Sequence, residues 1–231
     1  MSIKESIEEL YQKILLRTAD KEGLNYYSYL FKSGKLTLDD IKNELDNSDE
    51  KKYLNSRSSL LNLLPKKSRC VEIGIWKGEF SKKILEIVDP IEFHLIDPWK
   101  LYDDPVHQNS LYGKNIDQNT LDLIFQSTHK LFLNYDNIFI HRDFSKNALK
   151  KFNDDYFDWI YIDGDHAYSS ILNDLELSYQ KIKKDGIICG DDYVSGNWWK
   201  DDVIRAVDDF SRDYNCTLQV INTQFLLKPV K

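Results

Sequence analysis

The sequence predicts an α/β protein in two parts: a small all-helical domain over residues 1–64, then a doubly wound, mostly parallel seven-stranded sheet over residues 65–231. Three observations carry this prediction. Before residue 65 the apolar residues recur at helical spacing, with no strand pattern. From Arg69 onward, short apolar runs alternate with amphipathic helical segments. The last two runs are separated only by Asn222-Thr223, which indicates a terminal antiparallel hairpin.

The composition restricts the partners and the compartment. The 231 residues carry 38 Asp and Glu against 31 Lys and Arg, and a net charge of −7 argues against nucleic acid as a partner. The three cysteines, Cys70, Cys189 and Cys216, are odd in number and far apart, so we expect reduced thiols and no disulfide or zinc framework. Because we find no signal peptide and no stretch of transmembrane length, we expect a cytoplasmic protein without a membrane partner.

The first 64 residues predict four helices. Apolar residues recur at helical spacing from Ile3 to Leu15 and again around Leu24 and Leu30, and Gly34 is placed to end the second helix. Thr37 with Asp40 forms a capping-box pattern for the third helix. Ser48 is the candidate cap of a fourth. Such amphipathic helices need a packing partner, so we expect them either to form a small bundle or to pack on the next domain. A homo-oligomer formed through these helices is a further expectation.

This helical segment resembles a family of bacterial domains of unknown function. The residues that carry the resemblance are Leu10-Tyr11, Leu15, Arg17, Ala19-Asp20, Gly23, Tyr26-Tyr27, Leu30, Gly34, Ser48 and Glu50. The resemblance implies a packing or oligomerisation module and names no chemistry.

The rest of the chain predicts alternating strands and helices. Strands are expected over 70–73, 91–96, 137–141, 157–162, 186–190, 216–221 and 224–227, and helices over 80–88, 121–133, 168–182 and 199–210. Residues 98–117 are polar, aromatic and irregular. A connection this long in a compact domain is usually functional, often as a lid. We expect its His107 to be exposed, and His94, His129 and His141 to be structural.

A glycine-containing turn follows the first predicted strand. It reads Glu72-Ile73-Gly74-Ile75-Trp76-Lys77-Gly78 and opens the next helix. Glycines permit a tight turn and a close ligand, and a helix N-terminus favours an anionic group. Asp97, at the tip of the second strand, stands where nucleotide-binding α/β folds hold a ribose diol. This order of elements favours a nucleotide-like cofactor over the alternative that the glycines only shape a turn.

Two acidic segments follow two of the later strands. Strand 157–162 runs into Asp163-Gly164-Asp165-His166, and strand 186–190 ends in Asp191-Asp192. If these strands are neighbours, Asp163, Asp191 and Asp192 converge at the sheet edge where ligands bind. Three close carboxylates repel one another unless a cation joins them, so the pattern favours a hard divalent ion. The alternatives are that Asp165 only caps the next helix and that Asp192 is a solvated turn residue.

The glycine turn resembles the first motif of class I methyltransferases that use S-adenosylmethionine, with the acidic residue two positions before the first glycine. The resemblance implies a Rossmann-like methyltransferase sheet closed by an antiparallel strand, which the terminal hairpin matches. It also implies a set of cofactor-binding positions within or after the first three strands, namely Glu72, Gly74, Trp76, Gly78, Ser81, Asp97, Asp143 and Phe144.

Residues 161–168 and 184–193 narrow the resemblance to metal-dependent O-methyltransferases that act on sugars and other small molecules. It implies that Asp163, Asp191 and Asp192 bind Mg²⁺ or another divalent cation, and that Asp163 and His166 are catalytic, with His166 as the base. An imidazole whose unperturbed pKa is about 6.5 can take a proton near neutral pH. The expected acceptor is a hydroxyl of a small polyol such as a sugar. Some relatives have His-Asp at the position of Asp191-Asp192, so a metal-free site stays open.

Three other functions fit parts of the pattern. A glycosyltransferase could hold a metal-bound nucleotide sugar through Asp163-Gly164-Asp165, but it would leave Glu72 to Gly78, Asp97 and Asp143 unused. A non-catalytic binding module would not need the site carboxylates. A nicotinamide oxidoreductase is disfavoured because its dinucleotide fingerprint is Gly-x-Gly-x-x-Gly, and here Ile75 and the bulky Trp76 interrupt that spacing. Four tryptophans are candidates either for a sugar-binding surface or for core packing: Trp76, Trp99, Trp198 and Trp199.

Overall fold

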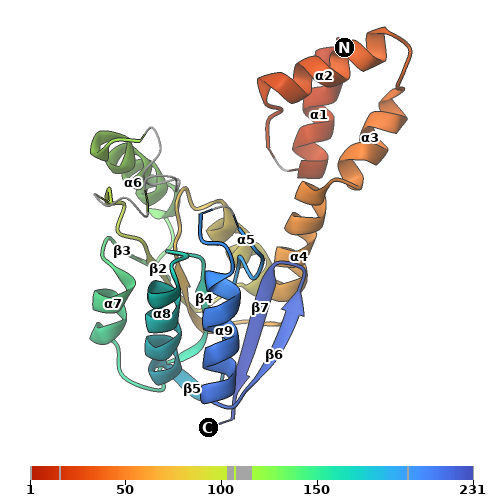
Figure 1. Cartoon of the computed structure of the whole chain (residues 1–231). Coiled ribbons are helices and arrows are strands. Elements are labelled where there is room, and N and C mark those ends of the chain that lie inside the picture. The colour runs from red at the N-terminus through yellow and green to blue at the C-terminus, as the bar shows by residue number, and fades with distance from the viewer. Residues whose placement is uncertain (1, 16, 103–106, 108–115, 197, 231) are drawn as a thin grey trace. The chain divides into compact units, whose positions relative to one another are not determined.

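The computed structural model of the chain describes residues 2–15, 17–102, 107, 116–196 and 198–230. Residues 103–106 and 108–115, which make up most of the predicted long connection, lie outside the described residues, so its interpretation as a lid stays a prediction. The chain divides into two compact units, Met1–Arg57 and Ser58–Lys231 (Figure 1).

The first unit is helical. It contains α1 (Ile3–Leu15), α2 (Lys21–Lys32), α3 (Leu38–Asp46) and the start of α4 (Asp49–Leu63). The capping box of Thr37 and Asp40 is confirmed at the start of α3. The guanidinium of Arg17 forms two hydrogen bonds with Glu50, of 2.6 and 2.9 Å, and so ties the α1–α2 connection to the first turn of α4. The core of this unit consists of Ile7, Tyr11, Ile14, Leu15, Ile41 and Leu45.

The second unit has the predicted seven-stranded sheet. Its strands are β1 (Arg69–Ile73), β2 (Glu92–Ile96), β3 (Ile138–His141), β4 (Phe157–Ile162), β5 (Ile182–Gly190), β6 (Cys216–Ile221) and β7 (Gln224–Pro229). They lie in the order β3-β2-β1-β4-β5-β7-β6. The pairs among β1 to β5 are parallel, and β7 is antiparallel to both β5 and β6. The predicted doubly wound sheet with its terminal hairpin is confirmed.

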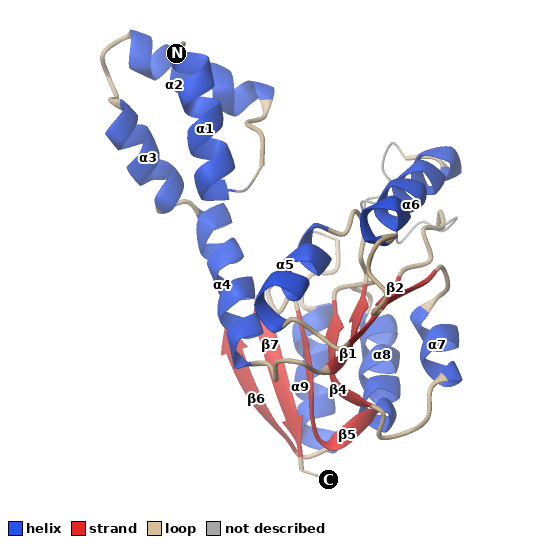
Figure 2. Cartoon of the chain, turned by 180° about the vertical axis from the view of Figure 1, so that it is seen from behind, coloured by secondary structure: helices blue, strands red, loops and turns tan. Residues whose placement is uncertain are grey.

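Helices cover both faces of this sheet. They are α5 (Glu79–Val88), α6 (Gln118–Phe132), α7 (Ser145–Ala148) with the 3₁₀ turn η2 (Leu149–Lys151), α8 (Tyr168–Lys181) and α9 (Asp202–Asp213). Figures 1 and 2 show α8 and α9 on one face and α5 on the other.

The central strand β4 shows why its sequence is apolar without alternation. Ile160 and Ile162 belong to the core under α8 and α9, whereas Trp159 and Tyr161 belong to the core under α5. A strand that is buried on both faces needs apolar side chains in both directions. The carboxyl ends of β1, β2, β4 and β5 therefore reach one edge of the sheet from a rigid base, which positions the loops that follow them.

Several element boundaries differ from the sequence prediction by up to four residues, and two of these differences have a clear physical cause. Strand β5 begins at Ile182, four residues before the predicted start at 186, because the charged stretch Lys183-Lys184-Asp185 reads as a loop but continues the strand. Helix α9 begins at Asp202 instead of at 199. Gly196 and Lys200 form a β-bridge, which keeps Trp198 and Trp199 in a turn before the helix. The short helix α7 was not predicted.

Candidate active site

The glycine turn between β1 and α5 requires its glycine at position 74. Gly74 has φ +86°, and a Cβ atom on it would lie 1.9 Å from the carbonyl oxygen of Asp163. Gly78 also has a positive φ, +76°, and so does Trp76, at +53°. A bulky residue with positive φ is costly and persists only where its surroundings hold it.

Three hydrogen bonds hold the strained Trp76. Its N–H donates to Oδ2 of Asp97 at 3.0 Å, and its carbonyl oxygen accepts from the indole N–H of Trp99 at 2.9 Å and from the hydroxyl of Thr128 at 3.2 Å. The turn is therefore fixed before any ligand arrives, which lowers the cost of ordering it on binding.

The predicted cofactor carboxylates lie beneath this turn. Asp97 is buried and accepts the N–H groups of Ile75 and Trp76 on Oδ2 and that of Trp99 on Oδ1. Glu72 is buried and accepts the hydroxyl proton of Ser81 at 2.6 Å. These bonds give the carboxylates a structural role, and their contact with a cofactor stays a prediction.

Asp143 and Phe144 follow β3 at the same edge of the sheet. Asp143 accepts from Asn147, Lys151 and the N–H of Phe144, each at 2.9 Å. The hydrogen bond from Asn147, followed by that from Lys151, lowers the pKa of Asp143 below its usual value. The ring of Phe144 lies edge-on to that of Tyr102, with centroids 6.1 Å apart.

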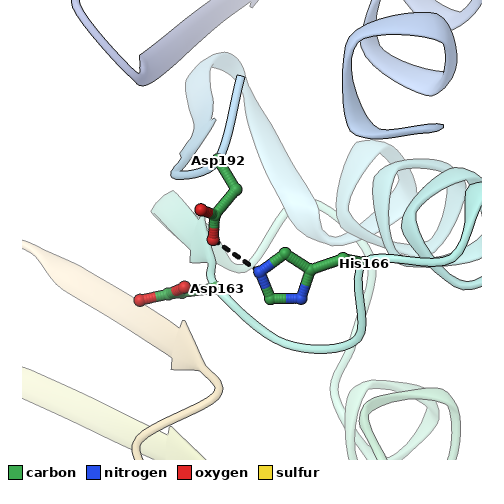
Figure 3. A group of neighbouring side chains, drawn as sticks. All are labelled: Asp163, His166 and Asp192. Carbon is green, nitrogen blue, oxygen red and sulfur yellow. Dashed lines mark hydrogen bonds and ion pairs between the residues drawn. The ribbon is translucent and has the colours of Figure 1, made fainter. Parts of the chain in front are cut away.

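Asp163, His166 and Asp192 form the candidate catalytic cluster (Figure 3). Asp163 and His166 come from the β4–α8 connection and Asp192 follows β5. Each residue offers one ligand atom, and these atoms lie within 4.8 Å of one another. Nε2 of His166 lies 2.5 Å from Oδ2 of Asp192. Asp192 has φ +60°, a conformation that aspartate tolerates better than most residues.

The structure does not bring Asp191 into this cluster, although the sequence predicts three converging aspartates. Oδ1 of Asp191 accepts from the hydroxyl of Thr223 at 3.0 Å, from the amide of Gln224 and from the N–H of Asp192 at 2.8 Å. Asp191 therefore ties the β6–β7 turn to the end of β5, and among the described residues His166 takes the third place in the cluster.

The protonation of His166 is set by its surroundings. Burial, the largest effect, lowers its pKa, but the hydrogen bond and charge of Asp192 and the charges of Asp163 and Asp165 together raise it above the usual value. The ring also packs against the indole of Trp199, with centroids 4.6 Å apart.

Asp165 is held in place by three groups. It accepts from the hydroxyl of Ser170 at 2.6 Å, from the N–H of Ala167 at 3.1 Å and from Nε2 of His107 at 3.0 Å. Asp165 thus contacts the start of α8, but the predicted capping is not seen, because the N-cap is Ala167 and no side chain forms a capping hydrogen bond there. The expectation that His107 is exposed was wrong: only 13% of its side chain is accessible.

Asp174 on α8 is a buried carboxyl group whose protonation state the sequence does not indicate. Its Oδ1 accepts from the hydroxyl of Ser145 at 2.5 Å. Burial raises its pKa to about 7. The signal that could have indicated this is the helical spacing, which places Asp174 on the same buried side of α8 as Ile171, Leu175 and Ser178.

The donor set of the cluster fits a divalent cation. Carboxylate oxygens suit Mg²⁺, Ca²⁺ and Mn²⁺, and an imidazole nitrogen suits transition ions. Asp163 and Asp192 are only partly buried, so an ion from solvent can reach them. In the absence of an ion, the same atoms form a histidine–aspartate pair.

The strand order and the glycine turn define the fold of class I methyltransferases that use S-adenosylmethionine. A family model for a methyltransferase domain matches residues 71–193, which is more than half of the chain, and the chain belongs to this family. Residues 2–55 match a domain of unknown function, DUF4214, as the resemblance of the helical segment suggested. The class I methyltransferase assignment made from the sequence is confirmed.

Solved structures agree with this fold. The O-methyltransferase NovP aligns with a TM-score of 0.60 and 18% identity, over 98% of this chain and 97% of that chain. A Staphylococcus aureus protein proposed to be a caffeoyl-CoA O-methyltransferase aligns with a TM-score of 0.52 and 14% identity, over 97% and 98%. The N-methyltransferase NodS from Bradyrhizobium japonicum WM9 aligns with a TM-score of 0.50 and 13% identity, over 80% and 99%.

Among curated proteins, the uncharacterized protein R132 of Acanthamoeba polyphaga mimivirus is 44% identical over 41 residues. The match covers 18% of this chain and 19% of that protein, so the chain matches about a fifth of this relative's length. In the described ranges, no helix combines the length and the apolar character that crossing a bilayer requires.

Proposed function

We propose that this methyltransferase moves the methyl group of S-adenosylmethionine to a hydroxyl group of a small polyol, with a sugar as the acceptor class. The observation that carries the proposal is the cluster of Asp163, His166 and Asp192 at the edge of the sheet that also bears the glycine turn. The O-methyltransferase neighbours support transfer to oxygen, by analogy of fold.

His166 is the proposed base. If its Nε2–H donates to Asp192, then Nδ1 is the basic atom that can take the proton of an acceptor hydroxyl. Asp192 then fixes the ring orientation and stabilises the imidazolium that forms. Holding the acceptor oxygen beside the methyl donor supplies much of the acceleration in such a bimolecular transfer.

The proposal includes a divalent cation, with Mg²⁺ as the first candidate. Asp163 and Asp192, with His166 beside them, are the residues that would hold it. Its charge would favour the ionised form of an acceptor hydroxyl. Asp163 would then be both a ligand and part of the catalytic centre, whereas in a metal-free site it would act through its charge on His166.

For the cofactor, we propose the turn from Gly74 to Gly78 as the binding surface, with Asp97, Asp143 and Phe144 at the neighbouring strand ends. The turn is already held by Asp97 and by the Trp76 carbonyl contacts. Glu72 and Ser81 would support it from below.

A cytoplasmic location and a homo-oligomer formed through the first unit complete the proposal. Cys70 and Cys189 are free and buried, and burial raises the pKa of both thiols, which suits a reducing compartment. Helix α2 exposes the side chains of Tyr26, Tyr29 and Phe31, which could pack against a second copy.

The test is calorimetric titration of the purified chain with S-adenosylhomocysteine, with and without Mg²⁺, alongside a uridine diphosphate sugar. Binding of S-adenosylhomocysteine alone supports the proposal. Binding of the nucleotide sugar alone would instead assign Asp163 and Asp165 to a glycosyltransferase. Binding of neither would favour a non-catalytic module.

A further inference from the structure

A second histidine–aspartate pair lies beside the proposed catalytic one. Nε2 of His107 is 3.0 Å from Oδ1 of Asp165, and their side chains are 13% and 14% accessible. The side chains of His166 and Asp192 are 21% and 24% accessible. Both pairs are therefore mostly enclosed, and both keep some access to solvent.

The indole of Trp198 contacts the histidine of each pair. Its ring centroid lies 5.5 Å from that of His107 and 5.8 Å from that of His166. Tyr102 stacks on His107, with centroids 4.4 Å apart. The two pairs and the aromatic rings thus form one continuous surface, in which the indole of Trp198 lies close to both histidines.

The local backbone is shaped to hold these indoles. The N–H of Gly196 donates to the carbonyl oxygen of Lys200 at 2.7 Å, which closes a tight turn. A Cβ atom at Gly196 would lie 1.8 Å from the indole of Trp199, so only glycine fits there. Trp199 also donates to the carbonyl oxygen of Val194 at 3.3 Å. The turn after β5 therefore brings both indoles to His166. Trp199 also packs against the core under α8 and α9, so Trp198 is the indole considered for the acceptor.

We propose that the acceptor binds on this surface, against Trp198, between the His107–Asp165 and His166–Asp192 pairs, and that it is a ring with an apolar face and two adjacent hydroxyl groups. The inference rests on the proposed function. An indole face packs well on the apolar side of a ring, whether aromatic or carbohydrate. Two histidine–aspartate pairs offer hydrogen bonds to two separate hydroxyl groups.

In this arrangement the pairs have different roles. His166 lies in the cluster with Asp163 and Asp192 and faces the hydroxyl group that is methylated. His107, held by Asp165, binds the neighbouring hydroxyl group and sets which one is methylated. His107 is thus a specificity residue, because a site built to hydrogen-bond a hydroxyl rejects analogues that lack it.

The test is saturation-transfer NMR of the full chain with S-adenosylhomocysteine present. The probes are methyl α-mannopyranoside and catechol, which distinguish a carbohydrate ring from an aromatic one. We expect transfer to the ring protons of one probe, and Trp198→Ala should weaken it about five- to ten-fold. His107→Phe, which keeps an aromatic ring at this position, should weaken it several-fold. Tyr135→Ala, an exposed tyrosine ahead of β3, is the matched aromatic control and should change nothing.

The binding of S-adenosylhomocysteine distinguishes a failure of the acceptor surface from a failure of the proposed methyl transfer. S-adenosylhomocysteine should bind to every variant. If it does but neither probe binds, the acceptor surface is refuted and the methyl-transfer proposal stands. The same conclusion follows if Trp198→Ala and His107→Phe bind the probes as the unmodified chain does. If S-adenosylhomocysteine does not bind to the unmodified chain, the proposed function fails and this inference fails with it.

Discussion

The backbone of Gly74 lies against the carbonyl group of Asp163, so closely that a Cβ atom at position 74 would stand 1.9 Å from that oxygen. The N–H of Asp163 in turn donates to the carbonyl oxygen of Ile73 at 2.8 Å. The turn proposed to bind the cofactor and the aspartate proposed to act on the acceptor therefore share a backbone contact. A disturbance at one is transmitted directly to the other.

Gly74→Ala should consequently impair both halves of the site. The substitution adds the cost of a positive φ, about 1 kcal/mol, to a clash with backbone that cannot move without displacing β4. We expect a lower melting temperature and a loss of S-adenosylhomocysteine affinity of about ten-fold or more. Calorimetry and thermal denaturation measure the two effects.

Gly34→Ala is the matched control for this substitution. Gly34 has φ +70°, and a Cβ atom added to it would meet open space within 4 Å, so this variant isolates the backbone cost from the clash. It should leave S-adenosylhomocysteine affinity unchanged. Equal effects of the two substitutions on affinity would show that the contact with Asp163 is unimportant.

The sequence predicted the sheet well because its strands are short apolar runs between clear turn signals. β4 illustrates this: Trp159 to Ile162 is apolar on both faces, as a strand between two layers of helices must be. The start of β5 was missed because Lys183 is only half-buried and Lys184 and Asp185 are exposed there, so burial places little constraint on residue type. The charged residues at this point predict a loop, whereas the structure shows this end of the strand paired with β4.

The site was predicted less completely, because spacing indicates which residues reach an edge but not which atoms they face. Asp191 and Asp192 are adjacent, so their side chains point in different directions, and the Thr223–Gln224 segment that binds Asp191 comes from the distant hairpin. The burial of His107 similarly depends on Asp165, which is 58 positions away in the sequence. Such long-range contacts have no local signal.

Removing a carboxylate of the cluster should weaken cation binding. We expect Asp163→Asn and Asp192→Asn each to lower the affinity for Mn²⁺, used as a probe for Mg²⁺, by about ten-fold or more, because an amide oxygen carries no charge to offset the ion. Asp191→Asn should lower it less, since an amide oxygen can still accept from Thr223 and Gln224. Calorimetric titration of the metal measures all three.

Glu86→Gln, on the exposed side of α5, controls for the change in net charge alone. If all four variants bind Mn²⁺ as the unmodified chain does, the cluster holds no cation. His166 and Asp192 would then act as a metal-free pair, and treatment with a chelator should leave methyl transfer unchanged.

The His94–His141 pair should make the fold sensitive to acid. Nδ1 of His94 lies 2.9 Å from Nε2 of His141, and burial lowers the pKa of both, that of His141 to about 4. Unfolded histidines take up protons near pH 6.5, whereas the folded pair resists protonation until lower pH. This contribution to stability is therefore complete above about pH 6.5 and is lost as the pH falls toward 4.

Urea denaturation between pH 7.5 and 4.5 tests this loss. His141→Gln can still donate a hydrogen bond to His94 but cannot titrate, so its stability should fall less steeply with acid. His129→Gln, on the exposed side of α6, should follow the unmodified chain. A His141→Gln profile parallel to that of the unmodified chain would exclude the pair as the source of acid sensitivity.

Asp174 should act in the opposite direction. Burial raises its pKa to about 7, so the folded state keeps a proton that the unfolded state releases near pH 4. Its contribution to stability is therefore greatest at low pH and declines between about pH 4 and 7, at a rate of up to about 1.4 kcal/mol per pH unit. The variant Asp174→Asn tests this contribution. It imitates the protonated form and can still accept the bond from Ser145, but it does not titrate.

The free energy of unfolding of Asp174→Asn, minus that of the unmodified chain, should rise steadily between pH 4.5 and 7 and then level off. The slope of this difference is the measurement, because its absolute size also contains any strain that the amide introduces beside Gly164. A difference that stays constant with pH would mean that Asp174 is ionised in the folded chain at all these pH values, with its charge stabilised by groups other than Ser145.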